Sequence, residues 1–464
     1  MPRTLIRNGH ILTMNHAGDE FADGSVLIED GRIAYVGPSA GVQAIADAEI
    51  LDAGGCAILP GLINCHTHLC MIFGRTIGVE RRLLDWLQLE MPIMARLDDE
   101  TTRLGATLGC VENLKNGNTT VVENTFIPRR DDFTPENAIF GAMETVGLRG
   151  IVARAYHARN FAPEFLETQA QQEAKVKALH EQWHGAAEGR LGLSIGPLLP
   201  WIVDIDDLRA TRRLADLLDL KIHMHVAESP EFNVKIAETF GRKIRNVELL
   251  HEGGCLGPDV QAVAVADLSD REIELLAETG TPVVFDPQTR LFWGTGFPGI
   301  KRFTDAGLTA GLGTNGPAAN CGQDLFETMK YACATAKTAA NDPAALGRHR
   351  VLRMATIEGA RALGIADRTG SLEVGKDADV ITVNLAQPHL TPAIDVPAAL
   401  VYSAKGGDVR DAIVAGHLRM RDRQVLSVDE AALLQDCNAA ASRLVPDLAG
   451  APDLASAQSP ATSA

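Results

Sequence analysis

The segment Leu59-Pro60-Gly61-Leu62-Ile63-Asn64-Cys65-His66-Thr67-His68 joins an apolar, strand-like run, Ala57–Asn64, to two histidines. His66 and His68 are two residues apart, so on an extended chain both side chains point to the same face. Two imidazoles that converge at the C-terminal end of a strand are half of a typical metal site. The alternative is a pair of polar residues in a loop, and the position at the end of a predicted barrel strand favours the metal site.

Seven more apolar, strand-like runs follow along the chain. The eight runs are Ala57–Asn64, Thr119–Glu123, Gly150–Ala155, Leu191–Pro197, Lys221–Val226, Val260–Ala266, Pro282–Phe285 and Leu308–Gly313. Amphipathic stretches of helical length separate most of them, among them Asp99–Lys115, Glu167–Trp183, Asp206–Leu218 and Asp270–Glu278. This alternation predicts a parallel sheet with right-handed crossovers, and eight strands match an α/β fold of the (β/α)8 TIM-barrel type. Active-site residues are then expected just past the C-terminal ends of the strands.

Short β-rich runs flank this middle part on both sides. They are Thr4–Met14, Ser25–Ile28, Ile33–Val36, Ala378–Asn384, Leu400–Tyr402 and Val409–Met420. We expect one small β-sandwich domain built from both termini. The predicted parts are residues 1–57 and 366–427 for the sandwich, 58–365 for the barrel, 428–447 for a C-terminal helix and 448–464 for a tail. The tail holds too few large apolar residues to offset the entropy of ordering, which predicts disorder.

The composition is that of a globular protein. Of the 464 residues, 46% are hydrophobic and 22% are charged, which excludes collagen, a coiled coil and wholesale disorder. The 43 Lys and Arg against 60 Asp and Glu give a formal net charge of −17, which argues against nucleic acid or an anionic membrane as a partner. Eight cysteines without CxxC spacing, and no signal-like or long apolar run, predict a cytoplasmic protein with reduced thiols.

A second cluster lies in Lys221–Glu228, with the sequence KIHMHVAE. His223 and His225 share one face of the predicted strand, and Glu228 follows where the strand yields to a loop. A carboxylate beside a metal-bound water is placed for proton transfer, and burial would raise its pKa toward neutrality. We interpret His225 and Glu228 as functional, and His223 as a core histidine that forms a hydrogen bond inside the barrel.

Several motifs together resemble the amidohydrolase superfamily, in the branch of atrazine chlorohydrolase and the S-adenosylhomocysteine/methylthioadenosine deaminases. They are PGLINCHTHL (60–69), HVAES (225–229), Thr314-Asn315-Gly316, MATIEGARALG (354–364) and GSLEVGKDADVITVN (370–384). The resemblance covers roughly residues 4 to 430. It implies a homodimer or larger homo-oligomer that acts on a small molecule.

The resemblance also implies a role for each matching residue. His66, His68 and His225 would hold one divalent metal, most simply Zn²⁺, and Glu228 would be the acid and base. In this family the metal lowers the pKa of a bound water, and the resulting hydroxide attacks an electron-poor ring carbon or a carbonyl.

Two positions depart from the family pattern. Ala264 stands where the sixth strand carries a histidine, and Asn315 stands where the eighth strand carries the metal-binding, base-acting aspartate. An alanine cannot coordinate a metal, whereas the Asn315 amide oxygen can serve as a weak fourth contact but cannot accept the water's proton. Three neutral imidazoles can still hold zinc, as in carbonic anhydrase.

Other residues near the expected strand ends are candidates for substrate binding. Glu123 ends the second strand and His157 follows the third, where both would face the barrel mouth. Asp286 and Arg290 follow the seventh strand, and Asp286 can be a replacement carboxylate or part of a surface turn before a proline. The aromatic residues Trp86, Trp201, Phe292 and Trp293 can wall a pocket for a flat heteroaryl ligand or can be packing.

Three functions therefore compete. The first is a metal-dependent hydrolase or deaminase that cleaves a C–N or C–X bond of a small cyclic or heteroaromatic substrate. The second is a metal-independent acid–base enzyme on the same barrel, such as a lyase or an isomerase. The third is a binding barrel without catalysis, against which the joint presence of His66, His68, His225 and Glu228 argues.

Overall fold

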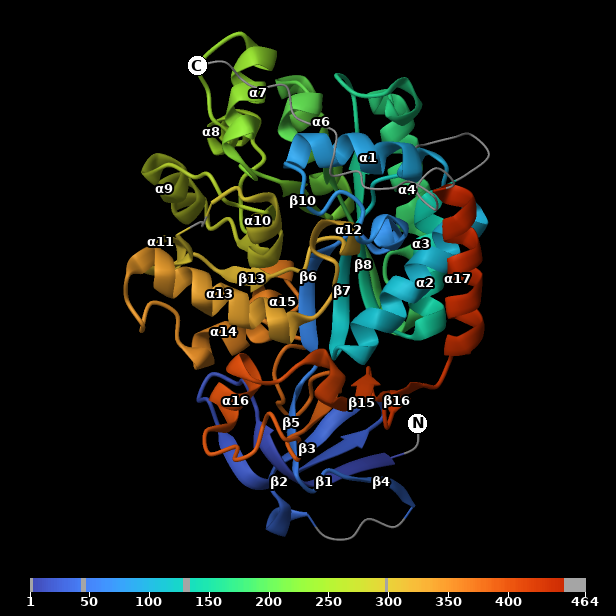
Figure 1. Ribbon diagram of the computed structural model, residues 1–464, viewed down its shortest axis with the longest axis vertical. Coiled ribbons are helices and arrows are strands. Elements are labelled where there is room, and N and C mark those ends of the chain that lie inside the picture. The colour runs from blue at the N-terminus through green and yellow to red at the C-terminus, as the bar shows by residue number, and fades with distance from the viewer. Residues whose placement is uncertain (1–2, 43–46, 128–133, 297–298, 446–464) are drawn as a thin grey trace.

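A barrel of eight parallel strands occupies the centre of the protein, as the computed structural model shows (Figure 1). The structure describes residues 3–42, 47–127, 134–296 and 299–445. The barrel strands are β6 (Leu62–Thr67), β7 (Asn118–Asn124), β8 (Arg149–Tyr156), β9 (Leu191–Pro197), β10 (Lys221–His225), β11 (Val260–Val263), β12 (Val283–Phe285) and β13 (Ala310–Leu312). They follow one another in chain order around the sheet, so the predicted (β/α)8 architecture is confirmed.

The barrel closes between its first and last strands. The backbone N–H of Asn315 donates to the carbonyl of His66 at 3.0 Å, and the N–H of Thr314 donates to the Asn64 side chain at 3.1 Å. These bonds place the segment after β13 directly beside the end of β6. The side chains of both segments therefore meet at the C-terminal mouth of the barrel.

Helices cover the outside of the barrel and its mouth (Figure 1). They are α1 (Leu83–Ala95), α2 (Asp99–Lys115), α3 (Pro135–Val146), α4 (Gln169–Trp183), α5 (Ala186–Gly189), α6 (Ile205–Leu218), α7 (Pro230–Phe240), α8 (Asn246–Glu252), α9 (Asp270–Thr279), α10 (Pro287–Trp293), α11 (Ile300–Asp305), α12 (Pro317–Asn320), α13 (Leu325–Ala340), α14 (Arg348–Met354) and α15 (Ile357–Leu363). The four helices predicted from amphipathic stretches are present. Each begins at a capping box, on Asp98, Thr168, Asp204 and Ser269.

The two ends of the chain form a separate nine-stranded sheet. Its strands are β1 (Arg3–Leu12), β2 (Glu20–Glu29), β3 (Arg32–Pro38), β4 (Ala48–Asp52), β5 (Cys56–Pro60), β14 (Val380–Asn384), β15 (Val409–Val414), β16 (His417–Arg421) and β17 (Gln424–Val425). The N-terminal and C-terminal parts join where β5 pairs antiparallel with β14. One hydrophobic cluster takes residues from both parts, including Ile6, Ile58 and Val380. Terminal strands thus share a core, as the sequence predicts.

Two of the predicted strands need correction. The run Ala57–Asn64 is split at Gly61: β5 belongs to the terminal sheet and β6 to the barrel, so the predicted boundary after residue 57 falls inside β5. A Cβ on Gly61 would lie 2.0 Å from Thr119 Oγ1, which explains why glycine stands at this change of sheet. The run Leu400–Tyr402 belongs to helix α16 (Val396–Tyr402), which is capped by Asp395. A short apolar run fits a buried helix as well as a strand.

A third predicted strand, Val409–Met420, is the hairpin β15–β16. Ala415 and Gly416 both have positive φ at its turn, as a two-residue hairpin loop requires. The C-terminal helix is α17 (Glu430–Leu444), which packs on α2, where Lys115 donates to Glu430 at 2.7 Å (Figure 1). The predicted tail, 448–464, lies outside the described residues.

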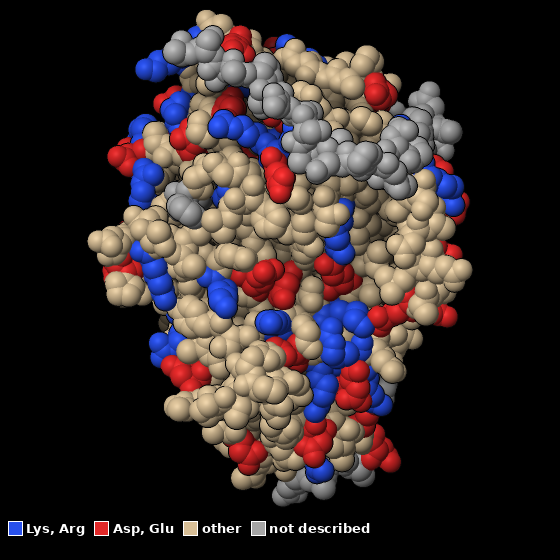
Figure 2. Space-filling view, viewed as in Figure 1, with Lys and Arg blue, Asp and Glu red and all other residues tan. Residues whose placement is uncertain are grey.

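One face of the protein mixes charges of both signs (Figure 2). On the face that Figure 2 shows, acidic and basic side chains are interspersed among uncharged ones. Among the helices in the described ranges, none combines the length and the apolar character that crossing a membrane requires.

Candidate active site

Three histidines meet at the C-terminal mouth of the barrel. His66 is the next-to-last residue of β6, His68 follows β6 directly, and His225 ends β10. Each offers one ring nitrogen, and these atoms all lie within 4.8 Å of one another. The three rings are buried, with 0%, 6% and 5% of the residue surface exposed. Their arrangement fits a shared ion better than three separate hydrogen-bonding sites.

The outer nitrogen of each ring is fixed by a neighbour. His68 Nδ1 donates to the carbonyl of Asn124 at 2.6 Å, and His225 Nδ1 donates to the carbonyl of Leu198 at 3.0 Å. His66 Nδ1 lies 3.1 Å from His223 Nε2. Such partners turn the Nε2 atoms inward, as they do around protein-bound metals. His66 Nε2 is buried and has no hydrogen-bond partner among the described residues, which is the feature that a bound metal would satisfy.

Burial keeps His66 and His68 neutral at physiological pH. Burial lowers the pKa of His68 to about 3, and the imidazole of His225 adds to this effect. Burial and the neighbouring rings also hold the pKa of His66 well below its ordinary value. Neutral imidazoles keep the lone pair that a metal ligand needs. His223 is 1% exposed and bonds to His66, in agreement with its interpretation as a core histidine.

A buried cluster of charges adjoins the histidines. Arg290 Nη2 donates to Glu228 Oε1 at 2.7 Å and to Asp286 Oδ2 at 3.1 Å, so one guanidinium bridges two carboxylates. Arg290 also donates to the backbone carbonyl of Glu228. Burial raises the pKa of Asp286 despite the opposing effect of Arg290. Asp286 and Arg290 are thus not a surface turn: both are 1% exposed.

The two departures from the family pattern have clear surroundings. Asn315 lines the cavity; its Nδ2 donates to Asp286 Oδ2 at 2.8 Å, and its Oδ1 accepts from the N–H of Gly316 at 2.6 Å. Ala264 follows β11, is fully buried, and donates its N–H to the carbonyl of Val284. Its methyl group adds no ligand.

The cavity above the histidines has mostly apolar walls. It measures about 400 Å³ including the space at its open mouth. Its lining residues are His68, Met71, Leu83, Trp86, Leu87, Phe126, Leu198, Leu199, His225, Glu228, Phe232, Trp293 and Asn315. Of the predicted aromatic residues, Trp86 and Trp293 line it, with ring centroids 5.1 Å apart. Trp201 is not a lining residue but packs against one, Phe232, with ring centroids 4.2 Å apart, and Phe292 is 41% exposed.

Glu123 and His157 lie behind the cavity rather than in its wall. Glu123 is 1% exposed, and its Oε2 accepts from the N–H of Leu69 at 2.5 Å, which fixes the chain just after His68. Burial raises the pKa of Glu123 to about 8. His157 packs against Phe161, with ring centroids 4.2 Å apart. Neither residue is among those that line the cavity.

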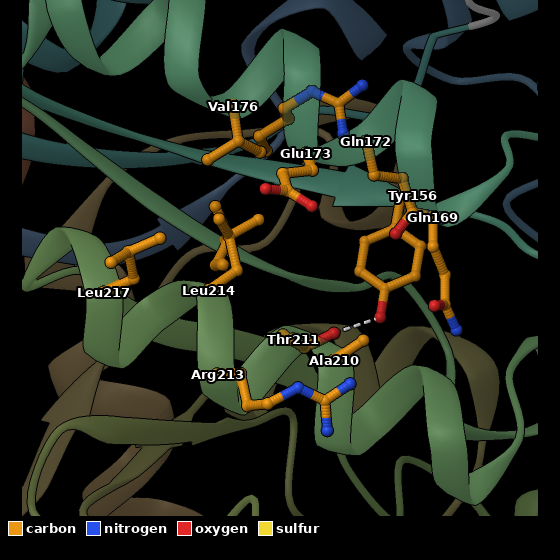
Figure 3. A pocket seen from close by; sticks show the side chains of 12 residues that line it. Tyr156, Gln169, Gln172, Glu173, Val176, Ala210, Thr211, Arg213, Leu214 and Leu217 are labelled. Atoms are coloured by element: carbon orange, nitrogen blue, oxygen red, sulfur yellow. Dashed lines mark hydrogen bonds between the residues drawn. The ribbon is translucent and has the colours of Figure 1, made fainter.

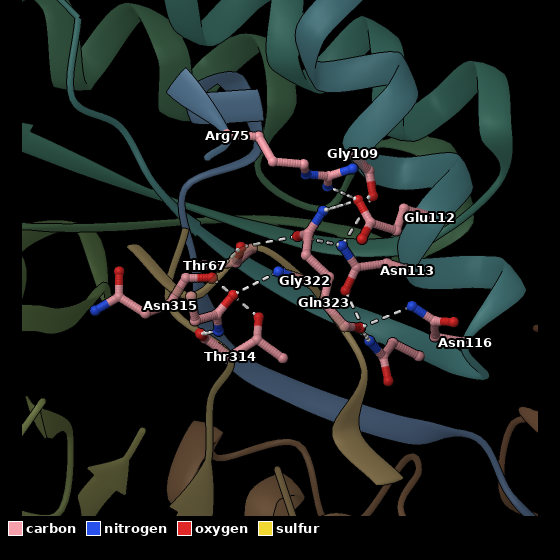
Figure 4. A network of polar contacts seen from close by, with 12 residues as sticks. Thr67, Arg75, Gly109, Glu112, Asn113, Asn116, Thr314, Asn315, Gly322 and Gln323 are labelled. Carbon is pink, nitrogen blue, oxygen red and sulfur yellow. Dashed lines mark hydrogen bonds and ion pairs between the residues drawn. The ribbon is translucent and has the colours of Figure 1, made fainter. Parts of the chain in front are cut away.

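A buried polar network that the sequence analysis missed supports the end of β6 (Figure 4). Gln323 Oε1 accepts from Thr67 Oγ1 at 2.9 Å and from Asn113 Nδ2 at 2.6 Å. Thr67 also donates to the backbone carbonyl of Asn315 at 2.9 Å. Thr67 lies between His66 and His68 in the sequence, and this position was the one signal from which the network could have been predicted. Apolar lining residues such as Phe126 and Phe232 carry no sequence signal that separates them from core residues.

A second hollow lies outside the barrel, between α4 and α6 (Figure 3). Tyr156, Gln172 and Arg213 are among its lining residues. Arg154 also borders it, but its Nη2 is engaged with both oxygens of Glu167 at 2.7 Å. None of the three histidines lines this hollow, so we assign the active site to the barrel mouth.

Comparison with known proteins identifies related sequences. Residues 57–419 match the model of the amidohydrolase family. A 5-methylthioadenosine/S-adenosylhomocysteine deaminase from Desulforudis audaxviator is 35% identical over 450 residues, which cover 96% of this chain and 99% of that protein. A 5'-deoxyadenosine deaminase from Methanosarcina mazei is 34% identical over 447 residues, with 96% and 99% covered.

Solved structures share the fold. An adenosine deaminase from Xanthomonas campestris with bound zinc is 29% identical, with a TM-score of 0.89 and coverage of 96% of this chain and 98% of that one. Atrazine chlorohydrolase from Arthrobacter aurescens TC1, complexed with zinc, is 24% identical, also with a TM-score of 0.89, and covers 94% of this chain and 100% of its own. At this lower identity the second likeness shows the fold alone.

Proposed function

Because this chain belongs to the amidohydrolase family, we propose that it is a zinc-dependent deaminase that hydrolyses an exocyclic C–N bond of a small heteroaromatic compound. The observation that carries the proposal is the set of three inward-facing imidazoles at the barrel mouth. The deaminase names of relatives at 34–35% identity support the C–N bond as the target.

The three histidines fit a zinc ion. Their Nδ1 atoms are engaged with neighbours, their Nε2 atoms are inward, and His66 Nε2 is buried without a partner among the described residues. When bound, zinc supplies a water nucleophile that is available at neutral pH. We expect Asn315 to contribute an amide oxygen at most, since that oxygen already accepts from Gly316.

Glu228 is the residue we propose as the proton carrier. It lines the cavity beside His225, and its Oε1 is fixed by Arg290 at 2.7 Å. Its second oxygen, Oε2, can then take a proton from the nucleophile and deliver it to the ring or to the leaving amine. Arg290 limits the carboxylate to one orientation, and the apolar walls exclude bulk water around it.

The cavity walls support a flat, largely apolar substrate. Trp86, Phe126, Phe232 and Trp293 offer aromatic surface, and Glu228 is the one carboxylate among the described lining residues. The substrates named for the relatives, methylthioadenosine, S-adenosylhomocysteine and 5'-deoxyadenosine, share an adenine ring, and the 5' group is uncharged in methylthioadenosine and 5'-deoxyadenosine. We propose that the substrate here is an adenine derivative or a similar aminated heterocycle with an uncharged substituent.

Metal content and ammonia release test the proposal together. We expect the purified protein to hold about one zinc ion per chain and to release ammonia from members of a panel of adenine derivatives and aminotriazines. Treatment with dipicolinic acid should abolish this activity and added Zn²⁺ should restore it. Full activity in a metal-free preparation would instead favour direct acid–base chemistry, and no turnover across the panel would favour a binding protein.

The variant Glu228→Gln tests the proton carrier. It should lower kcat at least 100-fold while zinc content stays unchanged, because the amide cannot accept a proton. Glu238→Gln, on the exposed face of α7, is the matched control and should leave kcat unchanged. Normal turnover by Glu228→Gln would remove this residue from the mechanism.

A further inference from the structure

Asp286 is a buried carboxylate that lies behind Asn315 and makes more than one polar contact. It follows β12, is 1% exposed, and accepts from both Asn315 Nδ2 at 2.8 Å and Arg290 Nη2 at 3.1 Å through the same oxygen, Oδ2. Its other oxygen, Oδ1, is buried without a hydrogen-bond partner among the described residues. A buried, incompletely paired carboxylate is costly unless positive charge lies nearby.

The charges around Asp286 do not cancel. Arg290 is the one cation that contacts Asp286 or Glu228 among the described residues, and it serves both carboxylates. Two carboxylates and one guanidinium leave a formal charge of −1 next to the three imidazoles. A divalent cation on the histidines would complete this cluster, because it supplies the missing positive charge.

Asp286 also explains why residue 315 is an amide. An aspartate at 315 would place a second carboxylate about where the Asn315 Nδ2 now donates to Asp286, and like charges at that distance repel. Asparagine removes the conflict, since its Nδ2 donates while its Oδ1 faces Gly316. The residues at 286 and 315 are thus a matched pair, acceptor and donor.

We propose that the pair Asp286–Asn315 replaces the single aspartate that the family places after the eighth strand, with the negative charge moved to the end of β12. Asp286 is a positioning residue: it fixes Asn315 directly and Glu228 through Arg290, and its charge strengthens metal binding by the histidines. This inference rests on the proposed zinc site.

A double-mutant cycle tests the inference. The proteins are the wild type, Asp286→Asn, Asn315→Asp and the double variant Asp286→Asn/Asn315→Asp. The readout is the zinc dissociation constant, measured by competition with a chromogenic chelator. Asp286→Asn keeps an oxygen that accepts from Asn315 but loses the charge, so we expect zinc affinity to fall 10–100-fold without loss of folding. A purely structural role predicts no change in this variant.

The double variant decides the result. It places one carboxylate at 315 and an amide at 286, so we expect zinc affinity to recover to within about threefold of the wild type, whereas Asn315→Asp alone stays impaired by repulsion. The inference would be overturned if the losses of zinc affinity in the two single variants add up in the double variant. It would also be overturned if Asp286→Asn binds zinc as tightly as the wild type. Asp305→Asn, on the exposed end of α11, is the matched control for an Asp-to-Asn change.

The same measurements separate this inference from the proposed function. A wild-type protein that binds no zinc contradicts the proposed function itself. A wild-type protein that binds zinc, combined with additive losses, contradicts the charge replacement alone. If Asn315→Asp folds poorly, Asp286→Asn still tests the charge, and Asp286→Glu, which keeps the charge, should retain more affinity than Asp286→Asn.

Discussion

His223 determines the orientation of His66 although it does not line the cavity. The two rings are stacked, with centroids 5.3 Å apart, and His66 Nδ1 lies 3.1 Å from His223 Nε2. If His66 binds a metal through Nε2, its Nδ1 carries the ring proton and donates a hydrogen bond to His223 Nε2. Burial lowers the pKa of His223 to about 3, so His223 is neutral and available as this acceptor.

The variant His223→Leu should therefore weaken zinc binding without removing a ligand. We expect the zinc dissociation constant to rise 10–100-fold, because His66 loses the partner that fixes its ring. His223→Gln keeps an acceptor oxygen and should lose less. His251→Leu, on the exposed last turn of α8, is the control. Equal zinc affinities in His223→Leu and His251→Leu would show that His223 serves packing alone.

Residue types indicated the three histidines that meet at the barrel mouth but not every neighbour. His66, His68 and His225 stand out in the sequence because imidazoles at strand ends are chemically costly to keep without a use. Glu123 also lies near the end of a strand, yet its carboxylate accepts a hydrogen bond from the backbone N–H of Leu69 behind the site. A sequence places a residue after a strand, but the twist of that strand decides whether the side chain enters the cavity.

At the scale of elements, the junction of β6 and β13 is the part of the barrel on which the site depends most. Figure 4 shows that Thr67, Asn113 and Gln323 connect this junction to α2. Gln323 also donates through Nε2 to Gly109 and Glu112 of α2. Its backbone carbonyl accepts from Asn116 and Asn118. The network holds β6, which contains His66 and is followed directly by His68.

Gln323→Leu should destabilise the protein by about 2–3 kcal/mol, because it removes the buried acceptor that Thr67 and Asn113 share and the hydrogen bonds that Gln323 Nε2 donates to α2. The free energy of unfolding in urea measures the loss, and zinc content after dialysis reports whether the end of β6 has loosened. Gln424→Leu, at an exposed position of β17, controls for the substitution itself. An unfolding midpoint equal to that of the control would mean that water replaces the glutamine without cost.

Element types were predictable wherever local signals agreed. The helix over residues 99–115 has an apolar period and a capping box at Asp98, and it forms with these bounds. The run Ala57–Asn64 misled because Pro60 and Gly61 lie inside one apolar stretch that serves two different sheets. The run Leu400–Tyr402 misled because three residues cannot reveal a period. Strand pairing decided the first case, and packing of α16 against α13 and α14 decided the second.

In the molecule as a whole, ion pairs connect the barrel to the terminal sheet in addition to the covalent connections of the chain. Arg149 at the start of β8 contacts Asp377 and Asp379 next to β14, each at 2.9 Å, and its side chain is 4% exposed. The split of the terminal sheet between both ends of the chain was predictable from the β-rich runs. These long-range ion pairs were not, because nothing local marks Arg149 as their partner. The homo-oligomer implied by the family resemblance stays a prediction.

Glu90 makes the stability of the whole molecule depend on pH. It lies on α1, is fully buried, and neither carboxyl oxygen has a hydrogen-bond partner among the described residues. Burial raises its pKa from 4.5 to about 8. Between these two values the folded state keeps a proton that the unfolded chain has released. Stability therefore falls as pH rises through this window, by up to ~1.4 kcal/mol per pH unit.

Glu90→Gln should remove this dependence, because an amide is neutral in both states. We expect the free energy of unfolding of Glu90→Gln relative to the wild type to increase between pH 5 and pH 8, by up to a few kcal/mol. Urea unfolding at both pH values measures the difference, and the contribution of Glu123 cancels since both proteins retain it. Glu100→Gln changes a carboxylate that is 72% exposed, so its difference from the wild type should not vary with pH. Parallel pH profiles for Glu90→Gln and the wild type would show that Glu90 is charged in the folded protein and has a partner that stabilises it.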